Sequence, residues 1–224
     1  MEHNNVEIFE QERASKYDQF VDIWIPNYKN YLEMLPKILR QQNDKNLLIV
    51  GCGTGNEIQG FLDAEEDWII RGIDPSPEMI NQAIQKYKNY SNVHFEKKLV
   101  QELLIEDIFS AATLSLVLHF LPDNGAKENI LKEIAAPLTP GAPFILLDIT
   151  GEESQIVKNL NILKDLLPTT IPQEEILFRL DRIKNDLFII SEDRLSSILL
   201  AAEFESPTRF FQSTIYSGWI TYKK

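Results

Sequence analysis

A glycine-rich turn and three polar side chains are the features of this sequence best suited to chemistry. The turn, Gly51-Cys-Gly-Thr-Gly55, follows the apolar run Leu47-Leu-Ile-Val50. Asp74 ends a second apolar run about 20 residues beyond the turn. His119 could take a proton from a hydroxyl or an amine, and Asp148 could orient an acceptor molecule. Because parallel strands bring such positions to one edge of a sheet, these residues predict a ligand site there.

The glycine turn and Asp74 together indicate the kind of ligand. Three glycines permit positive φ angles and let the backbone approach a ligand closely, and a helix that follows would present free N–H groups to it. Ordinary strand–turn–helix corners share this pattern, so the turn alone does not identify the ligand. In doubly wound sheets an acid at the position of Asp74 accepts hydrogen bonds from a ribose diol, although such an acid can also simply cap a turn.

Composition limits the class of protein. The chain has 224 residues, of which 44% are hydrophobic, and this suits one large α/β domain. The net charge of −12 opposes binding to nucleic acid on average, without excluding a local basic patch. No apolar run approaches about 20 residues, so no membrane-spanning helix is expected. The polar N-terminus does not resemble a secretory signal, and we expect a cytoplasmic protein.

Cysteine and histidine usage argues against a metal site. Cys52 is the single cysteine, which excludes an internal disulfide and a cysteine-cluster metal site. We interpret it as a small buried residue chosen for fit. The three histidines, at positions 3, 94 and 119, lack the spacing of metal ligands. No metal is therefore expected.

Two helices are predicted before the first strand. Helical spacing of apolar residues predicts one over 9–25, which Pro26 ends. A second follows from Tyr28, and Pro36 should kink or split it. Both helices must pack outside the sheet or over its carboxyl edge. Tyr17 or Tyr28 could then help to close the ligand site, although plain packing is the more common role of such tyrosines.

The remaining chain alternates predicted strands and helices. The segments that indicate strands are 47–50, 68–73, 92–96 and 143–149, and the segment 111–122 fits the fourth strand and the stretch after it. Ser76 and Pro77 suit the start of the helix after Asp74. Amphipathic helices within 151–190 predict a small cap near the site or a homodimer surface. A helix from Ser191 and an antiparallel pair over 206–212 and 215–222 are expected to close the fold.

The segments Leu48-Ile-Val-Gly-Cys-Gly-Thr-Gly55 and Gly72-Ile-Asp-Pro-Ser-Pro-Glu-Met79 resemble the glycine motif and the acidic loop of class I S-adenosylmethionine-dependent methyltransferases. A nicotinamide enzyme would more often carry GxGxxG, where this chain has Asn56-Glu57-Ile58. The resemblance covers most of 46–150 and, more weakly, 190–224.

This resemblance implies one α/β domain over 1–224. Its sheet would be Rossmann-like, seven-stranded and mostly parallel with an antiparallel last strand, and helices would cover both faces. The expected parts are N-terminal helices (1–44), a cofactor-binding half (45–150), a helical cap (151–190), and a last helix with closing strands (191–224).

The resemblance also implies a cofactor, S-adenosylmethionine, with S-adenosylhomocysteine as product. Residues of the glycine turn would contact the methionine part through backbone, Asp74 would bind the ribose, and neighbouring side chains would pack on adenine or close the site. The implied cofactor residues are Gly51, Cys52, Gly53, Gly55, Asp74, Pro75, Met79, Leu99, Val100, Leu116 and Tyr17. Two departures stand out: no acid lies near Lys98-Leu99 to accept from the adenine amino group, and Ser110 replaces the family's aspartate.

Three functions remain open from the sequence. The first is methyl transfer to a small molecule, with His119 and Asp148 as candidate residues on the acceptor side. The second rests on Ile25-Pro-Asn-Tyr28 and the segment 116–123, which are loosely similar to tRNA wobble-uridine carboxymethyltransferases. Those enzymes need a cation for a carboxylated cofactor, which Arg194 or Arg209 could supply. The third is a non-catalytic module that keeps the fold and the cofactor.

Overall fold

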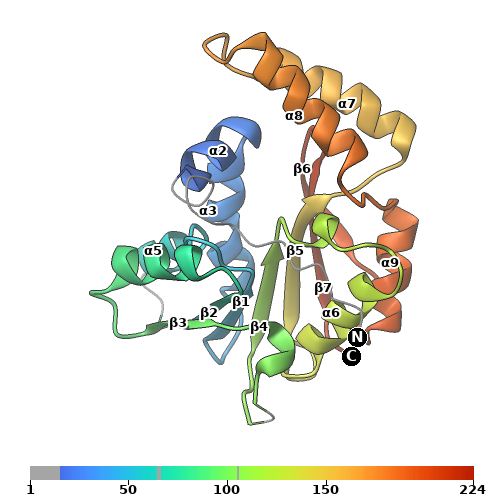
Figure 1. The fold of residues 1–224 in the computed structure, drawn as a ribbon. Helices are drawn as coiled ribbons and strands as arrows, with labels where there is room; N and C mark the ends of the chain where they lie inside the picture. Colours follow the sequence, from blue (N-terminus) through green and yellow to red (C-terminus); the bar gives the residue numbers. More distant parts are fainter. Residues whose placement is uncertain (1–15, 65–66, 105) are drawn as a thin grey trace.

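The computed structural model describes residues 16–64, 67–104 and 106–224, and its centre is one seven-stranded sheet (Figure 1). The strands are β1 (Asn46–Val50), β2 (Ile69–Asp74), β3 (Val93–Lys97), β4 (Ala111–Ser115), β5 (Pro143–Ile149), β6 (Thr208–Ser213) and β7 (Tyr216–Tyr222). Their order across the sheet is β3-β2-β1-β4-β5-β7-β6, and only β7 runs antiparallel to its neighbours. The predicted fold class is therefore confirmed.

The register of the central strands brings the expected site residues to one edge. Val50 of β1 pairs with Ile73 of β2 on one side and with Leu114 of β4 on the other. The glycine turn, Asp74 and the segment after Ser115 consequently leave the sheet side by side. Gly72 lets β1 and the turn approach β2, since a Cβ there would lie 2.9 Å from Cys52 Sγ.

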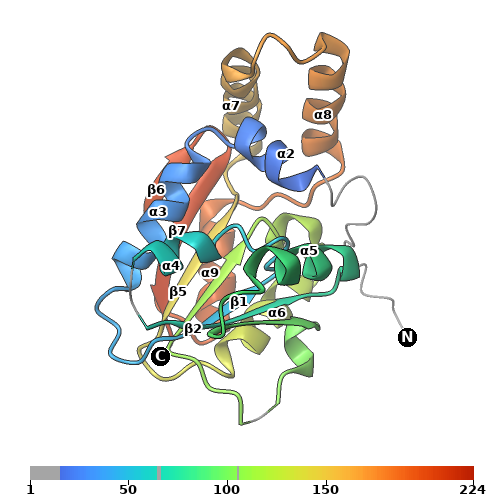
Figure 2. The ribbon, with the colours of Figure 1, turned by 90° about the vertical axis from the view of Figure 1, so that its left-hand side faces the viewer.

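Helices cover both faces of the sheet. They are α2 (Tyr17–Trp24), α3 (Tyr28–Leu39), α4 (Ile58–Asp63), α5 (Pro77–Tyr87), α6 (Ala126–Ala135), α7 (Glu153–Leu166), α8 (Gln173–Asn185) and α9 (Glu192–Ala201), with short 3₁₀ turns η1 (Val100–Glu102) and η2 (Leu118–Phe120). Leu47 and Ile49 of β1 pack in the core with α3 to α5, whereas Leu48 and Val50 pack with α6 and α9 (Figures 1 and 2). Burial on both faces explains why β1 is apolar throughout.

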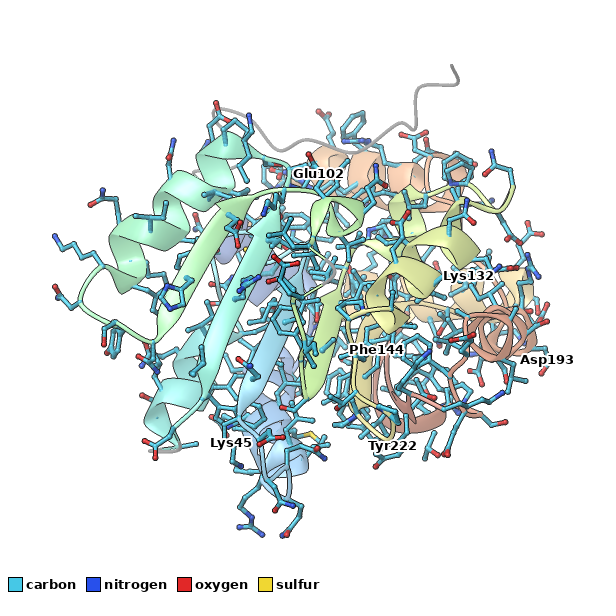
Figure 3. All side chains as sticks on the ribbon, turned by 90° about the horizontal axis from the view of Figure 1, so that it is seen from below. Lys45, Glu102, Lys132, Phe144, Asp193 and Tyr222 are labelled. Atoms are coloured by element: carbon cyan, nitrogen blue, oxygen red, sulfur yellow. The ribbon has the colours of Figure 1, made fainter. Side chains whose placement is uncertain are left out.

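Large apolar side chains form the buried core of the molecule. Phe144 of β5 is fully buried and stacks on Phe204 with ring centroids 5.0 Å apart. In the view from below, Phe144 lies near the middle of the molecule, whereas Asp193 lies at its edge (Figure 3). Within the described residues, no helix combines the length and the apolar character that a membrane crossing requires.

The N-terminal helices differ from the prediction at one residue. Helix α3 continues through Pro36, so the proline does not split it into two helices. Proline leaves the carbonyl of Leu32 without its intrahelical partner. At that place α4 contributes Gly60, whose missing Cβ lets the helices approach: an added Cβ would lie 3.1 Å from Leu32 O. The part of the predicted first helix at 9–15 lies outside the described residues.

Helices α7 and α8 form an antiparallel cap. The cap projects beyond the carboxyl edge of the sheet, with α8 beside α2 (Figures 1 and 2). A stacking contact joins the two elements, because the Arg179 guanidinium lies 5.0 Å from the Phe20 ring and 5.5 Å from the Trp24 ring. After α8 the chain returns to the sheet edge, where the Phe188 amide donates to the His119 carbonyl at 2.9 Å.

Candidate functional site

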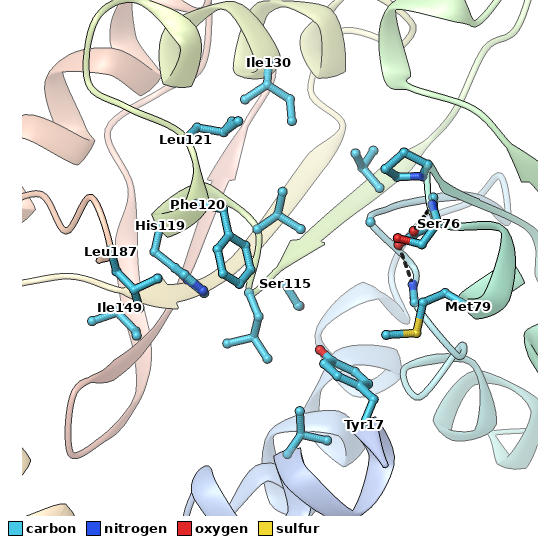
Figure 4. Close-up of a pocket in the computed structure, with 18 of the residues that line it drawn as sticks. Tyr17, Ser76, Met79, Ser115, His119, Phe120, Leu121, Ile130, Ile149 and Leu187 are labelled. Atoms are coloured by element: carbon cyan, nitrogen blue, oxygen red, sulfur yellow. Dashed lines mark hydrogen bonds between the residues drawn. The ribbon is translucent and has the colours of Figure 1, made fainter. Parts of the chain in front are cut away.

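One cavity of about 610 Å³ lies at the carboxyl edge of the sheet, between the glycine turn, α2, α8 and the segment after β4 (Figure 4). Its size is that of a small-molecule site. Nine of the residues implied as cofactor contacts line it, and His119 lines it as well. The nine are Gly51, Gly53, Asp74, Pro75, Met79, Leu99, Val100, Leu116 and Tyr17.

Cys52 and Gly55 are not among the residues that line the cavity. The Cys52 thiol is buried and lies against Gly72, as expected for a residue chosen for fit. Gly55 has a φ of 81°, and a Cβ there would lie 2.8 Å from the Tyr87 ring. The Tyr87 hydroxyl also donates to the Gly55 carbonyl at 2.8 Å. Cys52 and Gly55 therefore shape the turn through contacts with Gly72 and Tyr87 and do not line the cavity.

Asp74 connects the two loops beside the glycine turn. Its Oδ2 accepts from the Gly53 amide at 3.0 Å and its Oδ1 from the Ser76 amide at 2.8 Å (Figure 4). Burial raises the pKa of this carboxyl, and hydrogen bonds from the two amides and from the Ser76 side chain oppose that rise. Because a carboxylate offers about four acceptor sites, these three hydrogen bonds leave about one for a ligand hydroxyl.

Two backbone positions near the turn adopt positive φ. Gly51 has a φ of 64°, and a Cβ there would lie 2.5 Å from Val117 Cγ2, so this position requires glycine. Leu116, directly after β4, has a φ of 61° although it carries a side chain. Its amide donates to Leu147 O at 2.7 Å, which holds it in place. Such an outlier in a cavity wall is typical of functional sites.

His119 and Asp148, the two candidates for the acceptor side, form a pair. His119 Nδ1 donates to Asp148 Oδ1 at 2.9 Å, and both side chains are buried. Asp148 is itself fixed by the backbone amides of Leu118 and Ile149, each at 2.8 Å. Figure 4 shows the His119 ring directed into the cavity, with Nε2 as its remaining nitrogen. This arrangement can orient an imidazole and stabilise it after it takes a proton.

A buried lysine lies beneath the His119 segment. Lys127 of α6 is fully buried, and its Nζ donates to the Leu118 carbonyl at 2.6 Å. Burial lowers the pKa of Lys127 to about 8, although the charges of Asp148 and Asp123 oppose this. Sequence reasoning missed this residue, because a lysine in an amphipathic helix is normally exposed.

A second buried ionisable group, also missed, lies behind the glycine turn. Glu57 accepts a hydrogen bond from the Thr113 hydroxyl, and burial raises the pKa of its carboxyl. Ser115, which hydrogen-bonds Glu57, lies 3.2 Å from the Tyr31 hydroxyl. This polar chain ties α3 to the end of β4 under the site.

Helix α2 closes the cofactor end of the cavity. Tyr17 lies over the turn, 3.7 Å from where a Cβ of Gly53 would be, and burial raises the pKa of its phenol. Asp18 accepts hydrogen bonds from the Thr54 hydroxyl and, at 2.9 Å, from the Asn56 amide. Lys86 of α5 lies 3.4 Å from the same carboxylate. These contacts fasten α2 to the turn.

The other end of the cavity is mainly apolar. Its wall includes Phe20, Trp24, Phe120, Ile149, Ile183 and Leu187. Ile183 and Leu187 come from the cap and the segment after it, so the cap contributes directly to the site. The sequence had left open whether the cap is near the site or forms a dimer surface.

The two arginines considered as cation partners do not reach the cavity. Arg194 pairs with Asp123 at 2.8 Å, and Arg209 pairs with Glu192. Neither lines the cavity, and each side chain is instead engaged by its acidic partner. The arginines that do line it are Arg179 and Arg182 of α8.

The loop after β3 lines the cavity beside Asp74, whose carbonyl accepts from the Lys98 amide at 3.2 Å. Lys98, Leu99 and Gln101 line the cavity there. The Leu99 amide donates to Glu102 at 2.7 Å, so that carboxylate is engaged by the loop itself.

The sheet order, the glycine turn and the acid at the end of β2 define a Rossmann-like protein of the class I methyltransferase type. A family model described as "Methyltransferase domain" matches residues 48–144. The matched segment contains the glycine turn, Asp74 and β4, so it bears out the resemblance of these motifs to class I S-adenosylmethionine-dependent methyltransferases.

Curated relatives match at low identity. The chain is 29% identical over 150 residues to demethylmenaquinone methyltransferase of Bacillus licheniformis, an alignment that covers 66% of this chain and 63% of the relative. It is 30% identical over 156 residues to carboxy-S-adenosyl-L-methionine synthase of Helicobacter pylori, covering 66% and 64%. The synthase of Campylobacter curvus is 23% identical, covering 94% and 92%. The first two alignments thus span less than two thirds of the relatives' length.

Solved structures share the fold. The PH0226 protein from Pyrococcus horikoshii matches with a TM-score of 0.68 at 18% identity, covering 96% of this chain and 100% of that one. The N-methyltransferase NodS from Bradyrhizobium japonicum, solved with S-adenosyl-L-homocysteine, matches with a TM-score of 0.61 at 14% identity, covering 91% and 90%.

Proposed function

We propose that this protein transfers the methyl group of S-adenosylmethionine to a small, largely apolar acceptor. One observation carries the proposal: a single cavity joins the glycine turn and Asp74 at one end to His119 and apolar side chains at the other. The net charge of −12 further favours a small molecule over a nucleic acid. One relative is named for methyl transfer to demethylmenaquinone, which supports the same class of reaction.

The residues at the cofactor end fit S-adenosylmethionine. Beside its hydrogen bonds from Gly53 and Ser76, Asp74 keeps about one acceptor site for a ribose hydroxyl. Gly51 and Gly53 present bare backbone to the cavity, while Met79 and Leu99 offer apolar surface for adenine. When bound, the cofactor would supply an electrophilic methyl group. The protein's own contribution is then to bind, align and exclude water, and alignment can be worth about 7–11 kcal/mol.

We assign His119 the role of general base. His119 Nε2 would take the proton of the acceptor hydroxyl or amine as the acceptor gains its methyl group. Asp148, fixed by two backbone amides, would stabilise the charged imidazole. Proton transfer of this kind typically contributes about 10²–10⁴-fold to the rate.

Calorimetry tests the cofactor half first. S-Adenosylhomocysteine should bind the wild type, and Asp74→Ala should weaken that binding strongly. The proposal would be refuted if S-adenosylhomocysteine did not bind at millimolar concentration, or if Asp74→Ala bound it as tightly as the wild type. A panel of small apolar hydroxyl and amine compounds, scored by release of S-adenosylhomocysteine, then separates an enzyme from a module that only binds the cofactor.

A carboxylated cofactor is the second candidate. It is favoured by the relatives named carboxy-S-adenosyl-L-methionine synthase and by the two arginines that line the cavity. In this case carboxy-S-adenosylmethionine would bind more tightly than S-adenosylmethionine in parallel titrations. Equal or weaker binding would eliminate this alternative.

A further inference from the structure

Two arginines of the cap line the cavity. In the described lining the acids are Asp74 and Glu133, and the basic residues are Lys16, Lys98, His119, Arg179 and Arg182. Arg179 and Arg182 come from α8, and each is paired with an acid of its own helix, Glu175 and Asp186 respectively. What the two arginines offer a ligand is therefore the N–H donors that these pairs leave over, and such donors favour an anionic group.

Arg179 is held in position by its neighbours. Its guanidinium lies over the Phe20 and Trp24 rings at 5.0 and 5.5 Å. Nε and Nη2 both bind one oxygen of Glu175 at 3.0 Å. Since a guanidinium has five N–H donors, Nη1 remains for a ligand. A fixed planar donor of this kind suits a carboxylate.

Arg182 lies three residues further along α8, on the same face. Its Nε donates to Asp186 at 3.1 Å, which leaves its two terminal nitrogens for other contacts. Ile183 beside it also lines the cavity, so this part of α8 presents both apolar surface and positive charge to a ligand.

Arg179 of α8 lies against the part of α2 that is distant from the glycine turn. An anionic group bound there would therefore belong to the acceptor and not to the cofactor. Tyr17 marks the cofactor end, because it lies over Gly53. At a rise of about 1.5 Å per residue, Phe20 and Trp24 lie about 4.5 and 10 Å further along the helix. The cation therefore lies beyond the glycine turn by the length of a small aromatic body, in the apolar part of the cavity.

We propose that the acceptor is a flat, apolar carboxylic acid. Its carboxylate binds Arg179 and Arg182, its body lies among the apolar residues of the cap and α2, and its nucleophilic hydroxyl or amine faces His119. This inference rests on the proposed function, which it deepens by naming the acceptor class.

A matched pair of probes tests this assignment. 6-Hydroxy-2-naphthoate and 6-hydroxy-2-naphthamide differ in charge at one end and share body and hydroxyl. Each is titrated calorimetrically into the protein saturated with S-adenosylhomocysteine. The acid should bind the wild type about fivefold more tightly than the amide, as expected for exposed charge-assisted contacts. In Arg179→Gln with Arg182→Gln this preference should fall to about one.

Arg209→Gln is the matched control. Arg209 also forms an ion pair, with Glu192, and also lies over an aromatic ring, Trp219, at 5.4 Å, yet it does not line the cavity. The control should keep the acid preference. Because acid and amide share the same body, a merely structural effect of the variants would weaken both equally and leave the ratio unchanged.

Three outcomes overturn the assignment. The first is equal binding of acid and amide to the wild type, or binding of neither. The second is a preference that survives in the double variant. The third is tighter binding of carboxy-S-adenosylmethionine than of S-adenosylmethionine that the double variant loses, which would give the cation to the cofactor. Failure of S-adenosylhomocysteine itself to bind would instead overturn the proposed function.

Discussion

The buried lysine beneath the His119 segment should make the stability of this protein depend on pH. Lys127 is fully buried, with Nζ 2.6 Å from the Leu118 carbonyl oxygen. Burial lowers its pKa from 10.5 to about 8. At about 1.36 kcal/mol per pH unit, this difference corresponds to about 3 kcal/mol between the folded and unfolded states.

The direction follows from proton binding. A lysine whose pKa is lower in the folded state loses its proton there first, so between about pH 8 and 10.5 the unfolded state binds more protons. The free energy of unfolding therefore rises with pH over this window. Below about pH 8 the amine is charged in both states, and the cost of burying it is constant. Relative to Lys127→Met, which cannot titrate, the wild type should gain about 3 kcal/mol by the end of the window.

Urea denaturation of both proteins at intervals between about pH 7 and 10 measures this difference. Other titratable groups are shared by the two proteins and cancel. Lys132→Met is the control, because Lys132 lies on the same helix but is half-exposed and pairs with Glu128 at 2.6 Å. A wild-type advantage that stays constant with pH would refute the reasoning, as would an equal pH dependence in the control. Below about pH 8 the difference in unfolding free energy between wild type and Lys127→Met should not change with pH, and it includes the loss of the Lys127 hydrogen bond to the Leu118 carbonyl.

Three further substitutions test the site. Gly51→Ala should lower the free energy of unfolding by about 1–3 kcal/mol in urea denaturation, because the residue has positive φ and its Cβ would lie 2.5 Å from Val117 Cγ2; an unchanged midpoint would contradict this. Asp74→Asn should weaken S-adenosylhomocysteine binding about tenfold in calorimetry, since an amide cannot accept through both atoms. His119→Gln should lower kcat by about 10²–10⁴-fold with the acceptor found by screening, at unchanged S-adenosylhomocysteine affinity; a parallel loss of affinity would indicate a structural role instead.

The glycine turn and Asp74 can be predicted from the sequence because their signals are local. A turn only a few residues long requires the positive φ at Gly51, and another requires the carboxylate of Asp74. Residue type and spacing are therefore enough to predict both features. Glu203, in the turn that ends α9, also adopts a positive φ, of 65°, although it is not glycine. A local conformation can therefore be present without the residue type that usually signals it.

The acceptor half depends on contacts distant in sequence. Lys127 is buried only because η2 lies against it, and no pattern within α6 indicates it. Likewise, nothing near Arg179 in the sequence shows that α8 packs on α2. Arg194 and Arg209 appeared equally suitable as cation partners until the fold placed them outside the cavity.

Helix α2 connects the two halves of the site. Asp18 and Tyr17 at its start contact the glycine turn, while Phe20 and Trp24 receive the Arg179 guanidinium from the cap. The helix has eight residues and is about 12 Å long. A movement of α2 that breaks its contacts with the glycine turn would therefore also disturb its contacts with Arg179. A ligand that orders either end of α2 therefore makes the other end more favourable to bind, and cofactor and acceptor should each strengthen the binding of the other.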